Sequence, residues 1–353
     1  MHITETLFYA ISGFFILATL LPIIRLDHWW IRIFGFPRVQ ITVIGIVATI
    51  LATWSADSSI IFTSTFILLV CCLVYQCIKI IPYTPLYPVQ IINAGSSNEN
   101  DLVKLMIANV YMNNRDYASL ARHVIHYKPD ILLVVEVNHE WCHELRSQLK
   151  FEHEVSIPLE NTYGMAVFSN LPLSNTKIEY IVKKDVPSIH ADVLHSSGQR
   201  IKLSCLHPKP PAPQESKSTT KRDAELLIVG KRVKDHKGPT IVAGDLNDVA
   251  WSYTTALFQK ISSLLDLRIG RGMFNSYHAK LPFLRFPLDH VFVSKHFSVR
   301  QIQRLSAFGS DHFPIYVELQ ITPENRKEHN VPTANSKDEK HADRKINNGF
   351  DNN

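Results

Sequence analysis

Two polar residues follow an apolar run in the segment 240–248, which reads Thr-Ile-Val-Ala-Gly-Asp-Leu-Asn-Asp. Asp245 and Asn247 are separated by one residue, so an extended backbone would place both side chains on the same face. A carboxylate and a carboxamide at the carboxyl end of a buried strand could position a water molecule and a phosphate oxygen. The alternative is an ordinary turn, because Asp and Asn readily hydrogen-bond to their own backbone. Residues elsewhere in the chain favour the catalytic interpretation.

The same pattern recurs at the boundaries of other apolar segments. One or two polar residues stand there in each case: Asn109, Glu136, His207, Asp289 with His290, and Asp311 with His312. Each residue alone has an ordinary explanation as a turn, a cap or a surface side chain. Glu136, however, follows five consecutive apolar residues, and a buried carboxylate costs several kcal/mol unless it is paired or metal-bound. One shared site accounts for all of these positions together.

These side chains are the donors that hard cations prefer. Carboxylate, Asn and His side chains without cysteine suit Mg²⁺ or Mn²⁺. Mg²⁺ keeps several water molecules and binds few protein carboxylates when a substrate phosphate supplies further oxygens. The set therefore predicts metal-assisted hydrolysis of a phosphoester bond.

A soluble α/β domain has to position these residues. We predict strands over 103–109, 131–135, 164–169, 200–206, 240–245, 288–294 and 314–319. Helices are predicted after Asp116, which can cap the first of them, and over 219–236 and 252–261. The proline-rich segment 208–213 is predicted to be a surface loop. Residues 322–353 are hydrophilic and lack an apolar period, which predicts a disordered polar tail.

The N-terminal part of the chain is much more apolar. Residues 7–24, 39–54 and 60–81 form three apolar runs, and Lys79 is the only charged residue of the third. A membrane-spanning helix needs about 20 such residues, and a buried globular helix of that length would show a polar stripe. A cleaved signal peptide is the rival interpretation of the first run, but its charged segment and cleavage site are missing. We therefore predict a three-helix transmembrane anchor over 1–81 and a linker over 82–101.

The charges that flank these runs predict their orientation. The segment between the first two runs carries Arg25, Arg32 and Arg38 against one acid, Asp27, and no Lys or Arg precedes residue 7. Because positively charged loops stay in the cytoplasm, we expect the domain at 102–321 to be cytoplasmic. If the second run only lies on the membrane surface, the domain faces the other side.

The composition allows several phosphate-bearing partners. The formal net charge of the 353 residues is +5, a mild basic excess. We expect two groups of basic loop residues to attract polyanions such as nucleic acid or anionic lipid: Lys209, Lys217, Lys221 and Arg222, and Arg268, Arg271 and Arg285. No long basic stripe with interleaved aromatic residues marks a dedicated nucleic-acid track. The five cysteines lack zinc or disulfide spacing and fit a reducing compartment.

The ordered motifs resemble the endonuclease/exonuclease/phosphatase superfamily over roughly residues 102–321. They are Asn-Val at 109–110, Val-Glu-Val at 135–137, Tyr-Gly-Met-Ala-Val-Phe-Ser at 163–169, His207, Gly-Asp-Leu-Asn at 244–247, Leu-Asp-His-Val-Phe-Val-Ser at 288–294 and Ser-Asp-His at 310–312. The resemblance implies a four-layer, DNase I-like α/β sandwich. The His-Pro-Lys-Pro-Pro segment behind a multi-helix anchor is similar to a bacterial subgroup, which implies a multi-pass protein of the bacterial inner membrane.

The resemblance also implies a role for each site residue. Glu136 would be the principal metal ligand, with Asn109 and Asp311 near the metal and its waters. Asp245 would orient or deprotonate the attacking water, and Asn247 would hold a phosphate oxygen.

Four further residues complete the implied site. His312 would contact the phosphate and either stabilise the pentacovalent phosphorane or share the role of base. Asp289 would fix the tautomer of His312. His207 would assist the leaving oxygen, and Tyr163 would line the phosphate site. No role is implied for His290.

The expected function is thus a membrane-anchored, Mg²⁺- or Mn²⁺-dependent phosphoesterase. The superfamily contains DNA nucleases, RNA deadenylases, inositol-phosphate phosphatases and sphingomyelinases, so the fold does not choose the substrate. Tethering to a lipid bilayer favours a lipid headgroup or another target near the membrane. The alternative is a non-catalytic membrane scaffold or binding protein on a degenerate fold, which would not need a costly cluster of like charges.

Overall fold

The computed structural model describes residues 3–54, 57, 59–95, 101–212, 215–322 and 329–351. From Leu102 onward, twelve described strands form two sheets of six. The first sheet has the order β11-β12-β1-β2-β4-β3, with β1 (Leu102–Asn109), β2 (Ile131–Val135), β3 (His153–Ile157), β4 (Met165–Ser169), β11 (Phe297–Arg304) and β12 (Ile315–Ile321). The second has the order β5-β6-β7-β8-β10-β9, with β5 (Leu173–Glu179), β6 (Ser188–Leu194), β7 (Arg200–Cys205), β8 (Thr240–Asp245), β9 (Leu265–Asp266) and β10 (Asp289–Val293).

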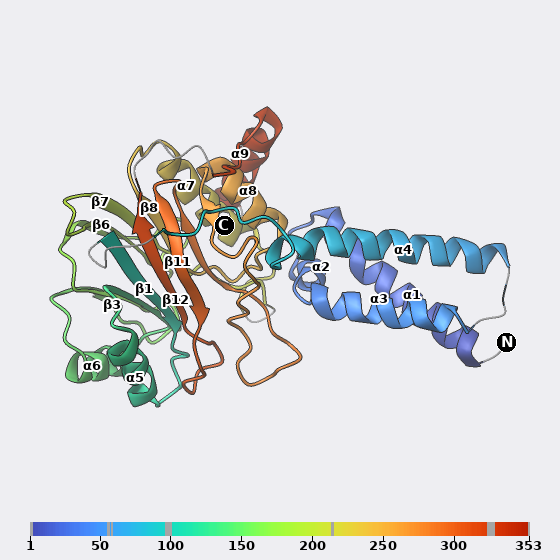
Figure 1. The fold of residues 1–353 in the computed structure, drawn as a ribbon, viewed down its shortest axis with the longest axis horizontal. Coiled ribbons are helices and arrows are strands. Elements are labelled where there is room, and N and C mark those ends of the chain that lie inside the picture. The colour runs from blue at the N-terminus through green and yellow to red at the C-terminus, as the bar shows by residue number, and fades with distance from the viewer. Residues whose placement is uncertain are drawn as a thin grey trace.

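Successive side chains of each strand point to opposite faces of the sheet, and this alternation separates the inner core from the outer helical layers. In β1, Leu105 and Ile107 belong to the core between the two sheets, whereas Met106 and Ala108 face the helices outside. The first sheet is covered by α5 (Tyr117–Tyr127) and α6 (His139–Gln148). The second is covered by α7 (Thr220–Lys234), α8 (Tyr253–Ser262) and α9 (Ser336–Asp351) (Figure 1). The predicted four-layer sandwich is confirmed.

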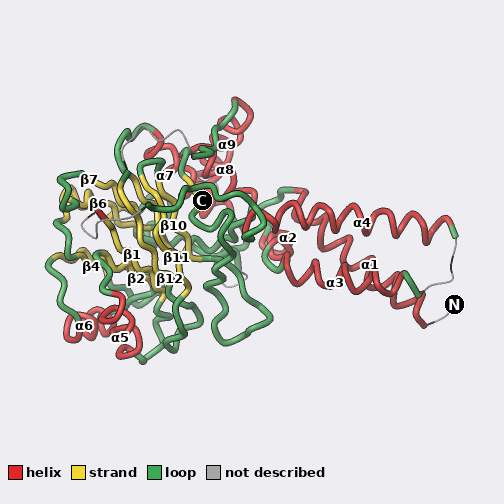
Figure 2. The backbone as a smooth tube through the Cα atoms, viewed as in Figure 1, coloured by secondary structure: helices red, strands yellow, loops and turns green. Residues whose placement is uncertain are grey.

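Three apolar helices precede the sandwich: α1 (Ile3–Leu20), α3 (Arg38–Ala52) and α4 (Ile60–Ile80). They lie side by side and project away from the strands, as Figure 2 shows. Short turns join these helices to one another and to the sandwich: η1 (Leu21–Ile24), α2 (Trp29–Arg32), η2 (Ile33–Gly35) and η3 (Ile81–Tyr83). Phe15 is buried inside the bundle, and a Cβ added to Gly45 would lie 2.7 Å from its ring, so glycine lets α1 and α3 approach closely.

The outer surface of this bundle is apolar. Leu17, Ile46 and Ile67 are about half exposed. Two stretches, Ile3–Ile24 and Ile60–Tyr83, are long and apolar enough to cross a membrane. The third meets the same test only when Trp29–Gly35 and Arg38–Ala52 are counted together, and these two parts are bent by 69°. By length and composition, the helices of the bundle are therefore suited to crossing a lipid bilayer.

The predicted disordered tail is wrong for residues 336–351, which form α9; residues 323–328 and 352–353 lie outside the described part. Ala342, Lys345 and Gly349 recur every three or four residues and are buried on one face of this helix. A Cβ at Gly349 would come within 2.3 Å of the Ala224 side chain. The missing side chain at Gly349 therefore lets the backbone of α9 lie directly against Ala224 of α7. The sequence suggested disorder because the buried residues of this helix are small or charged, and Ile346 adds only a partly buried apolar contact.

The predicted linker over 82–101 also packs against the sandwich where it is described. Ile91 is fully buried in the core between the sheets, and the amide of Ala94 donates to the carbonyl of Val299 at 2.8 Å. Residues 96–100 lie outside the described part of the chain.

Candidate active site

Polar residues from the two sheets meet at one end of the sandwich. β1 and β2 are parallel neighbours, so their carboxyl ends bring Asn109 and Glu136 to the same edge of the first sheet. In the second sheet β8 ends at Asp245, and the antiparallel register pairs this residue directly with Asp289, the first residue of β10. The topology thus assembles residues that are far apart in the sequence.

Asn109 joins the two sheets through its side-chain amide. Its Nδ2 donates to Glu136 Oε1 at 2.8 Å and to Asp245 Oδ2 at 3.0 Å. Its Oδ1 accepts from the amide of Tyr111 at 2.9 Å. Asn109 therefore holds two carboxylates near each other with its N–H groups. A role as a metal ligand through its oxygen stays a prediction.

His312 lies between two buried carboxylates. Its Nδ1 is 2.8 Å from Asp289 Oδ2, and its Nε2 is 3.5 Å from Asp245 Oδ2. Burial opposes protonation of the ring, but Asp289, Asp245 and Asp311 outweigh it and raise the pKa of His312 to about 10. Near neutral pH the ring is therefore a cation that donates to Asp289 and forms an ion pair with Asp245.

His207 has the opposite electrostatic character. It is 2% exposed, and its Nε2 lies 3.9 Å from Asp245 Oδ2, while its Nδ1 has no hydrogen-bond partner. Burial and the charge of His312 lower the pKa of His207 to about 3. The neutral ring can donate a hydrogen bond near neutral pH but cannot act as a protonated acid.

Tyr163 lies beside this histidine, with 5.5 Å between the ring centroids. Its hydroxyl donates to Glu215 Oε2 at 2.6 Å, and Lys209 Nζ lies 4.7 Å from its ring centroid. Its predicted contact with a phosphate would compete with the bond to Glu215.

The segment after Asp245 is a turn, not a continued strand. Asn247 has a φ of 50°, and its amide donates to Asp245 Oδ1 at 2.9 Å. The expectation that an extended backbone sets both side chains on one face is therefore wrong, because the Asp side chain captures the backbone two residues later. Asn247 Nδ2 donates to the carbonyl of Pro208 at 3.0 Å. Asn247 thus ties the turn to the loop that follows His207.

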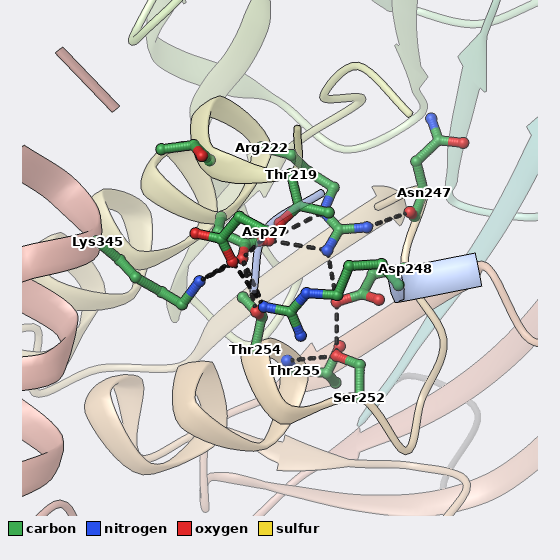
Figure 3. Close-up of polar contacts among 12 residues, drawn as sticks. Asp27, Thr219, Arg222, Asn247, Asp248, Ser252, Thr254, Thr255 and Lys345 are labelled. Carbon is green, nitrogen blue, oxygen red and sulfur yellow. Dashed lines mark hydrogen bonds and ion pairs between the residues drawn. The ribbon is translucent and has the colours of Figure 1, made fainter. Parts of the chain in front are cut away.

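A buried charge cluster supports this turn from behind, and the sequence did not indicate it. Arg222 reaches from α7 and donates to the carbonyl of Asn247 at 2.6 Å (Figure 3). The same guanidinium pairs with Asp223 at 2.8 Å and with Asp248 at 3.2 Å. Lys345 of α9 binds Asp223 and also Asp27, which precedes α2, both at 2.8 Å. The turn is therefore connected to the helix bundle and to α9.

Two of the basic residues expected to attract polyanions are not on the surface. Arg222 is 4% exposed and Arg268 is 3% exposed. Arg268 pairs with Asp266 at 2.7 Å and contacts His290 Nδ1 at 2.6 Å. The expectation was wrong for these two residues because each has buried acidic partners, which a sequence pattern does not reveal.

The carboxylate-rich site fits a divalent cation. Among the described residues, potential ligand atoms of Asp245, Asp289 and His312 lie within 4.8 Å of one another, although His312 could bind a metal only after losing its proton. Burial raises the pKa of both Glu136 and Asp245, and Asp311 adds to the effect at Glu136. Asp289 Oδ1 is buried without a hydrogen-bond partner. Bound positive charge would offset the cost of ionising these groups.

Comparison with known proteins identifies the family. Residues 106–312 match the endonuclease/exonuclease/phosphatase family. The chain belongs to this family. A UPF0294 protein of Erwinia tasmaniensis is 34% identical over 101 residues, which cover 28% of this chain and about a third (34%) of that protein's length. A UPF0294 protein of Vibrio cholerae is 24% identical over 230 residues, covering 62% of this chain and 78% of that protein.

Solved structures of other proteins share the sandwich. An endonuclease/exonuclease/phosphatase family protein from Bacteroides thetaiotaomicron has a TM-score of 0.54 and 15% identity, covering 65% of this chain and 98% of its own. TDP2 from D. rerio, complexed with a single-strand DNA product, has a TM-score of 0.52 and 17% identity, covering 62% and 99%. At these identities the likeness establishes the fold alone.

Proposed function

We propose that this chain is a membrane-anchored, divalent-metal-dependent phosphoesterase. The observation that carries the proposal is a set of buried polar residues assembled from two sheets at one edge and joined by hydrogen bonds and one ion pair: Glu136, Asn109, Asp245, His312 and Asp289. A set of buried like charges is costly to maintain, and a scaffold would gain nothing from it.

Glu136 and Asp311 are proposed to hold Mg²⁺ or Mn²⁺ together with Asn109. The bound ion would polarise a phosphoryl oxygen and offset the charge that develops on it. Asp245 would orient the attacking water and accept its proton, and burial helps because it raises the pKa of this carboxyl.

The two histidines would contact the phosphate in different protonation states. His312, held as a cation by Asp289, would donate to the phosphorane oxygens, which fits stabilisation of charge better than a shared role as base. His207, held neutral, would donate a hydrogen bond to the leaving oxygen. A phosphate contact of Asn247 or Tyr163 stays a prediction, because both side chains have protein partners.

One loop favours a substrate presented by the bilayer. The ring of Tyr277 lies 5.0 Å from that of His312, and the chain then runs to Phe283, whose carbonyl accepts from Gln40 of α3 at 2.8 Å. Phe283 is 85% exposed and Leu284 is 47% exposed. A loop with an exposed apolar tip that links the proposed active site to the membrane helices supports a phospholipid or inositol-phosphate substrate over nucleic acid.

The test is hydrolysis by the purified full-length chain. Bis-p-nitrophenyl phosphate, plasmid DNA, RNA, phospholipids and inositol phosphates should be compared with Mg²⁺ and with EDTA. Activity should disappear in EDTA and in Glu136→Ala, whereas Glu152→Ala at an exposed position should remain active. Undiminished hydrolysis in EDTA or in Glu136→Ala would refute the metal assignment, and inactivity toward the whole panel would favour the scaffold.

The proposed location is a bacterial inner membrane, with the sandwich in the cytoplasm. This orientation requires α3 to cross the membrane, although it meets the length test for a span only together with the bent segment before it. Reporter fusions after Pro88 test it. Green fluorescent protein should be bright and alkaline phosphatase inactive; the opposite pattern would place the domain on the other side.

A further inference from the structure

We propose that the junction between the helix bundle and the sandwich binds the phosphate of an anionic phospholipid headgroup. This inference rests on the membrane anchoring in the proposed function, not on the phosphoesterase activity. A cavity of about 190 Å³ lies between the ends of the helices and the segment 248–253 of the sandwich. At ~30 Å³ per water molecule, it has room for about six waters, or for a phosphate and part of its glycerol.

The lining of this cavity is basic. It contains four cations and one acid: Arg25, Arg32, Arg38, Lys79 and Asp248. Arg32 is paired with Asp27 at 2.8 Å, and Asp248 is paired with Arg222 at 3.2 Å. The other three cations have aromatic contacts but no acidic partner in the part of the chain that the structure describes. The cavity therefore carries a net positive charge.

Arg38 is the most confined of these cations. It is 5% exposed, and it donates to Gln76 Oε1 at 2.9 Å, while Gln76 donates to Thr19 at 3.0 Å. Its Nε has no hydrogen-bond partner. The ring of Tyr75 contacts both Arg38 and Lys79, with its centroid 5.5 Å from Arg38 Cζ and 5.8 Å from Lys79 Nζ. A neutral network thus fixes a buried guanidinium with an unused donor, and an anion in the cavity would balance its charge.

The position of the cavity indicates a lipid as the source of the phosphate. Arg38 begins α3 and Lys79 lies near the end of α4, at the end of the bundle that meets the sandwich (Figure 1). Trp30, at the same end, is 49% exposed, as expected for a side chain at a membrane interface. Ile23 lines the cavity and is 43% exposed, so an acyl chain could leave along the apolar outer face. Basic pockets at this level of a membrane bind anionic headgroups.

Native mass spectrometry of the full-length chain in detergent tests the proposal. Phosphatidylglycerol, phosphatidylcholine and free glycerol 3-phosphate should be titrated in EDTA, which stops metal-dependent hydrolysis. Phosphatidylglycerol should bind most tightly. Arg25→Gln/Lys79→Gln should weaken it by roughly 30-fold, from about 1 kcal/mol for each cation near the surface. The matched variant Arg200→Gln/Lys150→Gln, which removes the same charges from exposed positions of the sandwich, should bind as the wild type does.

Three results would overturn the inference. An equal loss of affinity for phosphatidylglycerol in both double variants would show a general charge effect. No loss of affinity in Arg25→Gln/Lys79→Gln would exclude the cavity as the binding site. Equal binding of glycerol 3-phosphate or phosphatidylcholine would exclude an anionic lipid. If the double variant does not fold, the single variant Arg25→Gln should still lose about fivefold. A chain without phosphoesterase activity would still bind phosphatidylglycerol in this cavity. Failure of the phosphoesterase proposal can therefore be distinguished from failure of this inference.

Discussion

Glu225 should make the stability of this protein depend on pH. This residue lies in α7, two positions after Asp223 in the sequence, and it is 2% exposed. Its Oε1 is buried without a hydrogen-bond partner. Burial raises the pKa of Glu225 from 4.5 to about 8. The folded protein therefore keeps this carboxyl protonated over a pH range in which the unfolded chain ionises it.

The magnitude follows from the difference between the two pKa values. Below about pH 4.5 both states are protonated, and the stability associated with the neutral carboxyl is fully present. As the pH rises, the unfolded state releases its proton first, so the free energy of unfolding falls by about 1.4 kcal/mol for each pH unit. Above about pH 8 the folded state also ionises and the loss levels off. The total is about 5 kcal/mol.

The perturbation is Glu225→Gln, which keeps the shape and removes the ionisation. Thermal unfolding of the full-length wild type and variant in detergent should be compared at about pH 5 and about pH 9. The advantage of the variant should grow by roughly 10 °C or more between these conditions, from about 2–4 °C per kcal/mol. Glu152→Gln at an exposed position should behave as the wild type does. If the difference between variant and wild type is the same at both pH values, the ionised carboxylate finds a partner and the reasoning fails.

Three further predictions concern the site and α9. Asp245→Asn and His312→Ala should each lower kcat by about a hundredfold or more with an unchanged circular dichroism spectrum; loss of activity through unfolding would make the residue structural. Asp289→Asn should remove the carboxylate that keeps His312 protonated, so activity should fall between about pH 6 and about pH 8 relative to the wild type; parallel profiles would show that the imidazolium is not required. Lys345→Met should lower the free energy of unfolding by about 3 kcal/mol, because it removes a cation from two buried carboxylates. Exposed Lys340→Met should change that free energy by less than about 0.5 kcal/mol, and equal effects of the two lysine variants would contradict the docking of α9.

The sequence predicted the central strands because they are largely apolar runs, and the resemblance of its ordered motifs to a known family implied the sandwich. β2, β4, β8 and β10 are buried along their whole length, so a local pattern is sufficient. β5 and β11 were not predicted. Most of β5 is exposed or half-buried, the second half of β11 is mostly polar, and the pairing of each strand depends on a neighbour. β6 alternates in part, and that weaker signal could have revealed it.

The sequence also determined where polar side chains follow buried strands, and therefore which residues could meet. Strand ends are local features, and parallel neighbours such as β1 and β2 bring theirs to one edge. The tertiary structure alone decided the partners: the register that sets Asp289 opposite Asp245, the turn that redirects Asn247, and the burial of Arg222. Lys345 and Asp27 pair across 318 positions of the chain. Such contacts depend on how whole elements pack, because a charge finds its counterion only after the fold has removed both from water.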